Sequence, residues 1–402
     1  MFPAVVLCIL IIPATAIADG AKSSAMGMAF TAVADDASAS SSNPAGLVQS
    51  RGADLYGGVS AVKLTTTYES PSGQMEKTEH RIYYVPHLFA VSDTGSTDAR
   101  IGVGIFSPFG IGGRTWSNEG LTRYASTENI IGTLTVNPTI AYQITPALSA
   151  GFGIDYMMSN LKSGEMVDQS ALGAGDGEIS IRADGHGWGY NAGILYTASD
   201  AWRLGLAYRS RIKVNYDGSF DYTSIAPAIQ PLFGGTAYHT AMQTSLTFPD
   251  IVSFGISYKP STAATLAFEL EQTRWSSFNR VDIDLQNEVS AAGLSDSSMN
   301  KDWHDVLAIK IGMEYKLSDR LAFRAGYFYM PDPIPEYTLG PDNPDATTNN
   351  ITLGAGYSAN GLTVDVYYMA TLYERRTVDN AILSGSYDNS MHTMGVSVGY
   401  RY

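Results

Sequence analysis

Apolar and polar residues alternate along much of this chain, with the two-residue period that is typical of a β-strand. At the C-terminus the apolar residues Met394, Val396, Val398, Tyr400 and Tyr402 alternate with small or polar residues. Successive side chains of a strand point to opposite faces of a sheet. The pattern therefore predicts one face against an apolar medium and the other against a polar space.

About fourteen segments carry this pattern, so the predicted fold is all-β. The predicted strands cover residues 52–68, 79–92, 98–107, 131–144, 147–160, 178–197, 200–214, 244–259, 262–274, 303–317, 320–330, 349–358, 361–374 and 391–402. Short links alternate with long connections, which span 108–130, 161–177, 215–243, 275–302, 331–348 and 375–390. Tight turns on one rim and long loops on the other predict a transmembrane antiparallel β-barrel. A soluble β-sandwich is the alternative, but it would not sort its loops by length so regularly.

The first 18 residues are predicted to be a signal peptide. They are mostly apolar and end in Ala16-Ile17-Ala18, which has the small residues of a cleavage site. A transmembrane anchor is disfavoured because the apolar run is short. Cleavage would remove Cys8, the only cysteine, so neither a disulfide framework nor a cysteine metal site is expected.

Composition narrows the possible functions. The net charge of −14 argues against a nucleic-acid partner, which would favour a basic surface. Charged residues make up only 16% of the chain, as expected where many side chains face lipid. The six histidines show no metal-ligand spacing, so we expect no metal site. The chain also has no glycine-rich phosphate loop and no paired-carboxylate motif, so we expect no cofactor, no catalytic residues and no enzyme. Tyrosines that could form aromatic girdles lie near strand ends: Tyr315, Tyr327, Tyr329, Tyr357, Tyr367, Tyr368, Tyr400 and Tyr402.

Residues 19–50 differ from the rest because they are rich in small residues and do not alternate. They end in a turn sequence at 43–46. A fourteen-stranded lumen is too wide to be filled by its own side chains. The segment is therefore either a free tail ahead of an open pore or a plug folded into the barrel of residues 51–402.

The sequence of this segment resembles the N-terminal hatch of the FadL family, outer-membrane barrels that transport long-chain fatty acids or aromatic hydrocarbons. The resemblance rests on Met26-Gly27-Met28-Ala29-Phe30, on residues 34–38 and on Asn43-Pro44-Ala45-Gly46-Leu47. It continues at Ser107-Pro108-Phe109-Gly110, which is similar to a strand-end motif of the family, and at residues 204–210.

The resemblance implies a monomeric barrel in the bacterial outer membrane that residues 19–50 plug as a hatch. It implies passive uptake of hydrophobic compounds without a cofactor. Such compounds would be captured among the loops, enter an apolar pocket beside the hatch and leave laterally through the wall into membrane lipid. The substrate-binding or gating residues carried over from the hatch motifs are Phe30, Asn43, Pro44, Ala45 and Gly46.

Charged residues on the predicted inward faces have two interpretations. A basic group could hold a fatty-acid carboxylate, and Arg209 and Arg324 are the best candidates. An ion-paired wall is favoured, since buried charges are normally paired. The predicted inward set is Arg203, Arg209, Arg211, Lys213, Lys310, Arg320, Arg324, Asp155, Glu269, Glu271, Glu314 and Asp365.

Two other functions remain open. A general diffusion porin would have an open, ion-conducting lumen, which the hatch argues against. A barrel enzyme would need a clustered catalytic set, which the scattered histidines do not supply.

Overall fold

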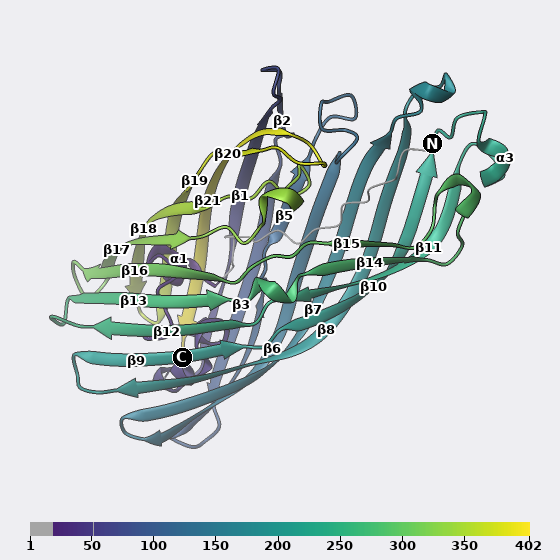
Figure 1. The fold of residues 1–402 in the computed structure, drawn as a ribbon. Coiled ribbons are helices and arrows are strands. Elements are labelled where there is room, and N and C mark those ends of the chain that lie inside the picture. Colours follow the sequence, from purple (N-terminus) through teal and green to yellow (C-terminus); the bar gives the residue numbers. More distant parts are fainter. Residues whose placement is uncertain (1–18, 51) are drawn as a thin grey trace.

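The computed structural model describes residues 19–50 and 52–402. The predicted signal peptide lies outside the described residues. The strands form a slanted barrel whose wall closes between its first and last members (Figure 1). Strand β1 (Asp54–Glu69) pairs with β21 (Gly385–Arg401) in antiparallel register, from Asp54↔Arg401 to Glu69↔Ser386. The predicted all-β barrel is confirmed.

Within the described chain the wall has fourteen strand positions. After β1 they are β3 (Ile82–Asp93), β4 (Ala99–Phe106), β6 (Glu128–Thr145), β7 (Leu148–Val167), β8 (Gly177–Thr197), β9 (Trp202–Arg209) with β10 (Ile212–Thr223), β11 (Tyr238–Phe248) with β12 (Ile251–Tyr258), β13 (Ala264–Thr273), β16 (Val306–Lys316), β17 (Leu321–Met330), β18 (Thr348–Ala359), β19 (Leu362–Tyr373) and β21.

The remaining elements lie in the hatch segment and on the loop rim. The short strands are β2 (Met75–Lys77), β5 (Ile111–Thr115), β14 (Arg280–Leu285), β15 (Ser297–Asn300) and β20 (Arg376–Val378). The helical turns are α1 (Ala21–Ala25), α2 (Ala39–Ser42), η1 (Pro44–Gln49), η2 (Ser170–Leu172), α3 (Gln230–Phe233), η3 (Trp275–Ser277), η4 (Ser290–Ala292) and η5 (Glu336–Thr338). No helix in the described ranges is long and apolar enough to cross a membrane.

The predicted strands agree with the structure near the short turns and end too early near the long loops. The strand predicted over 147–160 continues to Val167, and the last strand begins at Gly385 instead of 391. Outward residues on these extensions are polar, for example Lys162 and Asp388, so the apolar alternation stops before the strand does. The connection predicted over 108–130 also contains a strand, β5.

The alternation itself separates lipid-facing from lumen-facing residues. On β16, Ile309, Ile311 and Met313 are 39%, 51% and 42% exposed, whereas Lys310 and Glu314 are buried. The apolar side chains face lipid and the polar side chains face the lumen, which explains the two-residue period. Tyr367 is an exception to the predicted girdle, because it is buried and its hydroxyl donates to Ser60 Oγ at 2.8 Å.

Three residues predicted to face the lumen do not. Arg211 and Lys213 are exposed, and Arg320 is exposed in the turn before β17. A β-bulge explains the first two. Seven residues run from Arg209 to Asn215, while the partner stretch on β8 has only six, from Asn191 to His186. One extra residue reverses the faces of every residue that follows.

Candidate functional site

Residues 19–50, the hatch, lie inside the barrel and bond to strands on several sides of it (Figure 1). Glu269 on β13 accepts from Thr31 N at 2.8 Å, and Ser397 on β21 accepts from Ala21 N at 2.9 Å. From β8, Asn191 donates to the carbonyl of Ser40 at 2.7 Å. Contacts to strands so far apart around the wall fix the segment across the lumen.

The hatch approaches the wall too closely for side chains at some positions. Gly27 has a φ of 62°, and a Cβ there would lie 2.7 Å from the carbonyl oxygen of Ile311. Gly46 packs within the hatch, where a Cβ would lie 2.2 Å from the carbonyl oxygen of Ala34. Gly46, which we predicted as a site residue, therefore allows close packing of two hatch segments.

Asn43 links two parts of the hatch to the barrel wall. Its Oδ1 accepts from Ala45 N at 3.1 Å, which caps η1. Its Nδ2 donates to the carbonyls of Thr31 at 2.8 Å and of Ile194, on β8, at 3.1 Å. Pro44 occupies the first turn of η1, where a missing N–H has no cost. The carbonyl of Ala45 accepts from Ser149 Oγ at 3.0 Å.

Replacing Asn43 by alanine should loosen the hatch without opening the barrel wall. The change leaves buried carbonyls and one N–H unsatisfied, at a cost of about 2 kcal/mol or more. Amide hydrogen exchange in η1 should then accelerate roughly 30-fold or more, as measured by mass spectrometry. Ser42→Ala is the matched control, since the buried Ser42 hydroxyl has no hydrogen-bond partner. Equal exchange rates in the two variants would contradict this role of Asn43.

Phe30 packs inside the hatch. It is buried with Met26, Ala29, Val33 and the wall residue Ala267. Its surroundings are those of a core residue, and it lines none of the cavities described below.

Arg209 and Arg324 are both ion-paired, as the favoured interpretation predicts. Arg209 Nη1 lies 2.6 Å from Asp155 Oδ2, and its Nη2 donates to the carbonyl of Ser41. Arg324 lies between Glu314 and Asp365, at 2.7 and 2.6 Å. Arg324 borders a polar cavity of about 540 Å³ at the short-turn rim, which shares no lining residue with the cavity at Arg209.

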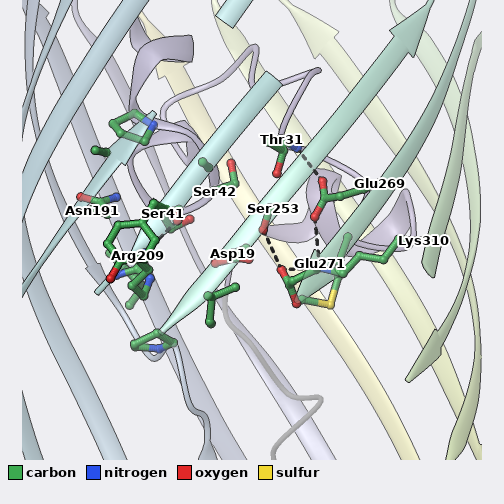
Figure 2. Close-up of a pocket in the computed structure, with 18 residues that line it drawn as sticks. Asp19, Thr31, Ser41, Ser42, Asn191, Arg209, Ser253, Glu269, Glu271 and Lys310 are labelled. Atoms are coloured by element: carbon green, nitrogen blue, oxygen red, sulfur yellow. Dashed lines mark hydrogen bonds and ion pairs between the residues drawn. The ribbon is translucent and has the colours of Figure 1, made fainter. Parts of the chain in front are cut away.

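A small cavity lies between the hatch and the wall in the middle of the lumen (Figure 2). Its volume is about 60 Å³, room for a few water molecules. Lys310 Nζ bonds to Glu269 at 3.2 Å and to Glu271 at 2.7 Å on one side, and Arg209 lies on the other. Pro44, Phe106 and Pro108 complete its lining together with hatch residues.

An apolar cavity adjoins the first one on the side of the long loops. Pro108, Ile251 and Glu271 line both cavities, and the apolar one is also lined by Phe109, Trp275, Val306, Met330, Pro333 and Asp345. Its volume is about 40 Å³. Side chains therefore nearly fill this part of the lumen, and a hydrophobic guest must displace some of them.

Phe109 forms an aromatic bridge across this part of the lumen. Its ring centroid lies 4.7 Å from that of Phe248 and 6.4 Å from that of Trp275. Trp303 extends the cluster, at 5.1 Å from Trp275. Strands far apart in sequence are thus joined by one residue from the interruption between β4 and β5.

The interruption is a turn at residues 107–110. Gly110 N donates to the carbonyl of Ser107 at 3.3 Å, and Gly110 has a φ of 77°. Proline cannot donate to a strand ladder, and glycine tolerates positive φ, so this sequence breaks the strand. Along β6, Thr135 pairs with Phe106 and Gly132 with Ile111. From Phe106 to Ile111 the interrupted strand advances by five residues, while β6 advances by only three, from Thr135 to Gly132. The interrupted strand therefore carries two extra residues.

The interruption leaves a gap in the wall between β3 and β5. β3 pairs with β4 only from Leu88↔Ile105 to Asp93↔Arg100. Residues 82–87 of β3 pair with β1 on their other side, but within the described chain they have no strand partner toward β5. The gap spans roughly 20 Å at about 3.3 Å per residue. Toward the long loops the gap ends at a backbone hydrogen bond, in which Glu79 N donates to the carbonyl of Thr115 at 2.8 Å.

A third apolar recess lies among the long loops. It is lined by Leu172, Tyr222, Ile229, Phe233 and Leu294, with Gln169 and Asp168 at its polar edge. Tyr222 lies near the end of β10, and the other residues come from the loops after β7, β10 and β14. Among the residues that the structure describes, no cluster of three His, Cys, Asp or Glu side chains could hold a metal ion.

Comparison with known proteins identifies the family. The family model described as outer membrane protein transport protein (OMPP1/FadL/TodX) matches residues 11–402. The chain belongs to this family. It is therefore an outer-membrane β-barrel, and the resemblance found in its sequence is confirmed.

Relatives and solved structures agree with this assignment to the FadL/TodX family. The long-chain fatty acid transport protein of Escherichia coli strain K12 is 23% identical over 400 residues, covering 87% of this chain and 86% of the relative. The crystal structure of a Pseudomonas aeruginosa FadL homologue matches with a TM-score of 0.84 at 18% identity, covering 95% of this chain and 98% of that one. The Pseudomonas putida toluene transporter TodX matches with a TM-score of 0.74 at 19% identity, with the same coverages.

The structure brings some predicted site residues together and adds others. Pro44 and Arg209 line the same lumen cavity. Arg324 borders a different cavity, at the short-turn rim, and Phe30 lies inside the hatch. Sequence reasoning missed Pro108 and Phe109 as lumen residues, although their Pro and Gly-flanked motif signalled a break. It also missed Arg114, which belongs to the short strand β5 inside a predicted loop.

Proposed function

We propose that the protein takes up hydrophobic compounds passively across the outer membrane, as a hatch-plugged barrel with lateral exit through its wall. The gap between β3 and β5 is the observation that carries this proposal. The turn at Pro108, where the gap begins, lines the lumen cavity together with Pro44 and Arg209. A guest in that cavity is next to an unpaired stretch of wall, and lipid lies on the other side.

The relatives support the same class of cargo. Their names refer to long-chain fatty acids and to toluene. The recess among the loops supplies an apolar surface on which such a compound can first bind. On its way from that recess to the lumen cavity, we propose that the compound passes the aromatic bridge at Phe109, which must then move.

The hatch is the proposed barrier to water-soluble molecules. It fills the lumen with buried small residues and is held by hydrogen bonds to β8, β13 and β21. We propose that the protein works as a monomer, with outer-membrane lipid as the acceptor of its cargo, and that it needs no cofactor and catalyses no reaction.

Uptake and conductance together test this function. A strain lacking the protein should regain uptake of oleate, toluene or both when the wild-type gene is restored, while glucose uptake stays unchanged. In planar bilayers the purified protein should show no large steady ion conductance. A large steady conductance without a gain in hydrophobic uptake would instead show a general diffusion porin.

A further inference from the structure

Arg114 differs from the other buried cations of the lumen. It lies on β5 beside the wall gap and is 3% exposed. Its Nε donates to Thr66 Oγ1 at 2.9 Å and its Nη2 to Asn389 Oδ1 at 3.4 Å. Its Nη1 is buried without a hydrogen-bond partner. An unpaired buried donor on a charged group is costly, so this nitrogen is suited to an incoming acceptor.

The other basic residues of the lumen already have their partners. Lys310 contacts two glutamates, Arg324 contacts two carboxylates, and Arg209 contacts one carboxylate and one carbonyl. Among the residues that the structure describes, no carboxylate forms an ion pair with Arg114. A carboxylate ligand would repeat the arrangement found at Lys310, Arg324 and Arg209.

Two acidic residues of the loop before β18, Asp342 and Asp345, are near enough to Arg114 to act on its charge. Asp342 lies 4.0 Å from Lys301 Nζ. Asp345 borders the apolar cavity, and burial raises its pKa to about 7 despite the opposing effect of Arg114. Near neutral pH a large fraction of Asp345 is therefore protonated, which leaves the charge of Arg114 only partly balanced.

A cluster of apolar side chains lies near Arg114. Leu64, Tyr83, Met330 and Tyr373 are on the inward faces of their strands but remain only partly buried. They pack on a cluster that includes the hatch helix α1. Tyr83 also bridges the wall gap, where its hydroxyl donates to the carbonyl of Gly113 at 3.2 Å.

We propose that Arg114 binds the carboxylate of an apolar carboxylic acid whose hydrocarbon part lies among these side chains beside the gap. The proposal rests on the proposed function and deepens it, because it names the chemistry of the cargo. A carboxylate forms charge-assisted hydrogen bonds with the guanidinium, and the apolar body is oriented toward the exit. Both an alkyl and an aryl acid have this chemistry, and the experiment separates them.

Binding of acids and of their uncharged methyl esters tests the site. The folded protein in lipid nanodiscs at pH 7.5 is titrated with dodecanoate and methyl dodecanoate, and with 4-butylbenzoate and its methyl ester. We expect at least one acid to bind roughly tenfold or more tightly in the wild type than in Arg114→Gln, while its ester binds both equally. The acid that shows this loss identifies the alkyl or the aryl class.

Two further variants control for structure and charge. Arg81→Gln removes a half-exposed arginine near the gap that is already paired with Glu79 and Glu128, and it should leave acid binding unchanged. Asp345→Asn removes the competing carboxylate, and acid binding should tighten several-fold. This gain remains measurable if Arg114→Gln fails to fold.

The outcomes separate the site from the function. Equal losses for acid and ester in Arg114→Gln, or no change for either, would overturn the carboxylate site while hydrophobic uptake stands. An unchanged affinity for both acids in Asp345→Asn would also count against it. If the wild type binds none of the four compounds, the acid site is overturned, and the uptake of oleate and toluene decides the proposed function separately.

Discussion

Deletion of Pro108 and Phe109 is expected to abolish uptake of hydrophobic compounds while the barrel still folds. The interrupted strand carries two residues more than β6 requires between Phe106 and Ile111. Removing two residues preserves the alternation of faces, so Arg114 and Phe106 still point inward. β4 can then continue into β5 and pair with residues 82–87 of β3, which closes the gap.

Uptake in whole cells and folding in detergent are the measurements for this variant. We expect uptake to fall to the level of a strain without the protein, with unchanged strand content by circular dichroism. Phe109→Ala is the matched control, because it removes the aromatic bridge but keeps the turn and the gap. Its uptake should equal or exceed that of the wild type. Wild-type uptake through the two-residue deletion would show that cargo leaves by another route.

Deletion of residues 22–46 is expected to turn the barrel into an open, unselective pore. The barrel should survive, because the main lumen ion pairs join wall residues to one another: Lys310 with Glu269, Arg324 with Asp365 and Arg209 with Asp155. The hatch contributes Lys22, whose 2.7 Å partner Asp35 is deleted with it. A lumen of this width cannot close on its own side chains.

Conductance and small-solute permeation measure this effect. We expect ion conductance in planar bilayers to rise roughly tenfold or more and selective hydrophobic uptake to be lost. Deletion of Pro108 and Phe109 serves as the comparison, since it seals the wall and keeps the hatch. An unchanged conductance would mean that the loops, through contacts such as Trp116 Nε1 to the carbonyl of Pro341 at 2.9 Å, close the lumen alone.

Much of the barrel could be predicted from the sequence, because the alternation of faces is a local property. Each strand of the wall separates lipid from the lumen. The polarity of each residue in a strand therefore indicates whether its side chain faces lipid or the lumen. The prediction failed where the pattern ended or slipped. The strands continue past the lipid with polar outward residues, and the bulge after Arg209 placed Arg211 and Lys213 on the outside.

The candidate site was less predictable because it depends on contacts between distant parts of the chain. The motif at residues 43–46 indicated the hatch, but only the structure shows Asn43 joined to Thr31 and Ile194. Arg209 and Arg324 looked equivalent in the sequence, yet they lie in different cavities. The Pro and Gly at 108 and 110 signalled a break without showing that it opens the wall.

By itself, the sequence determined an all-β membrane barrel, the inward or outward direction of most strand residues and the family of the chain. These features follow from the two-residue period and from short motifs, which neighbouring residues are enough to specify. Closure of the barrel decided the rest: the seating of the hatch, the bridge from Phe109 to Phe248, the gap beside β3 and the unpartnered nitrogen of Arg114. Each of these features depends on contacts between residues that are far apart in the chain. A local sequence pattern contains no information about such contacts.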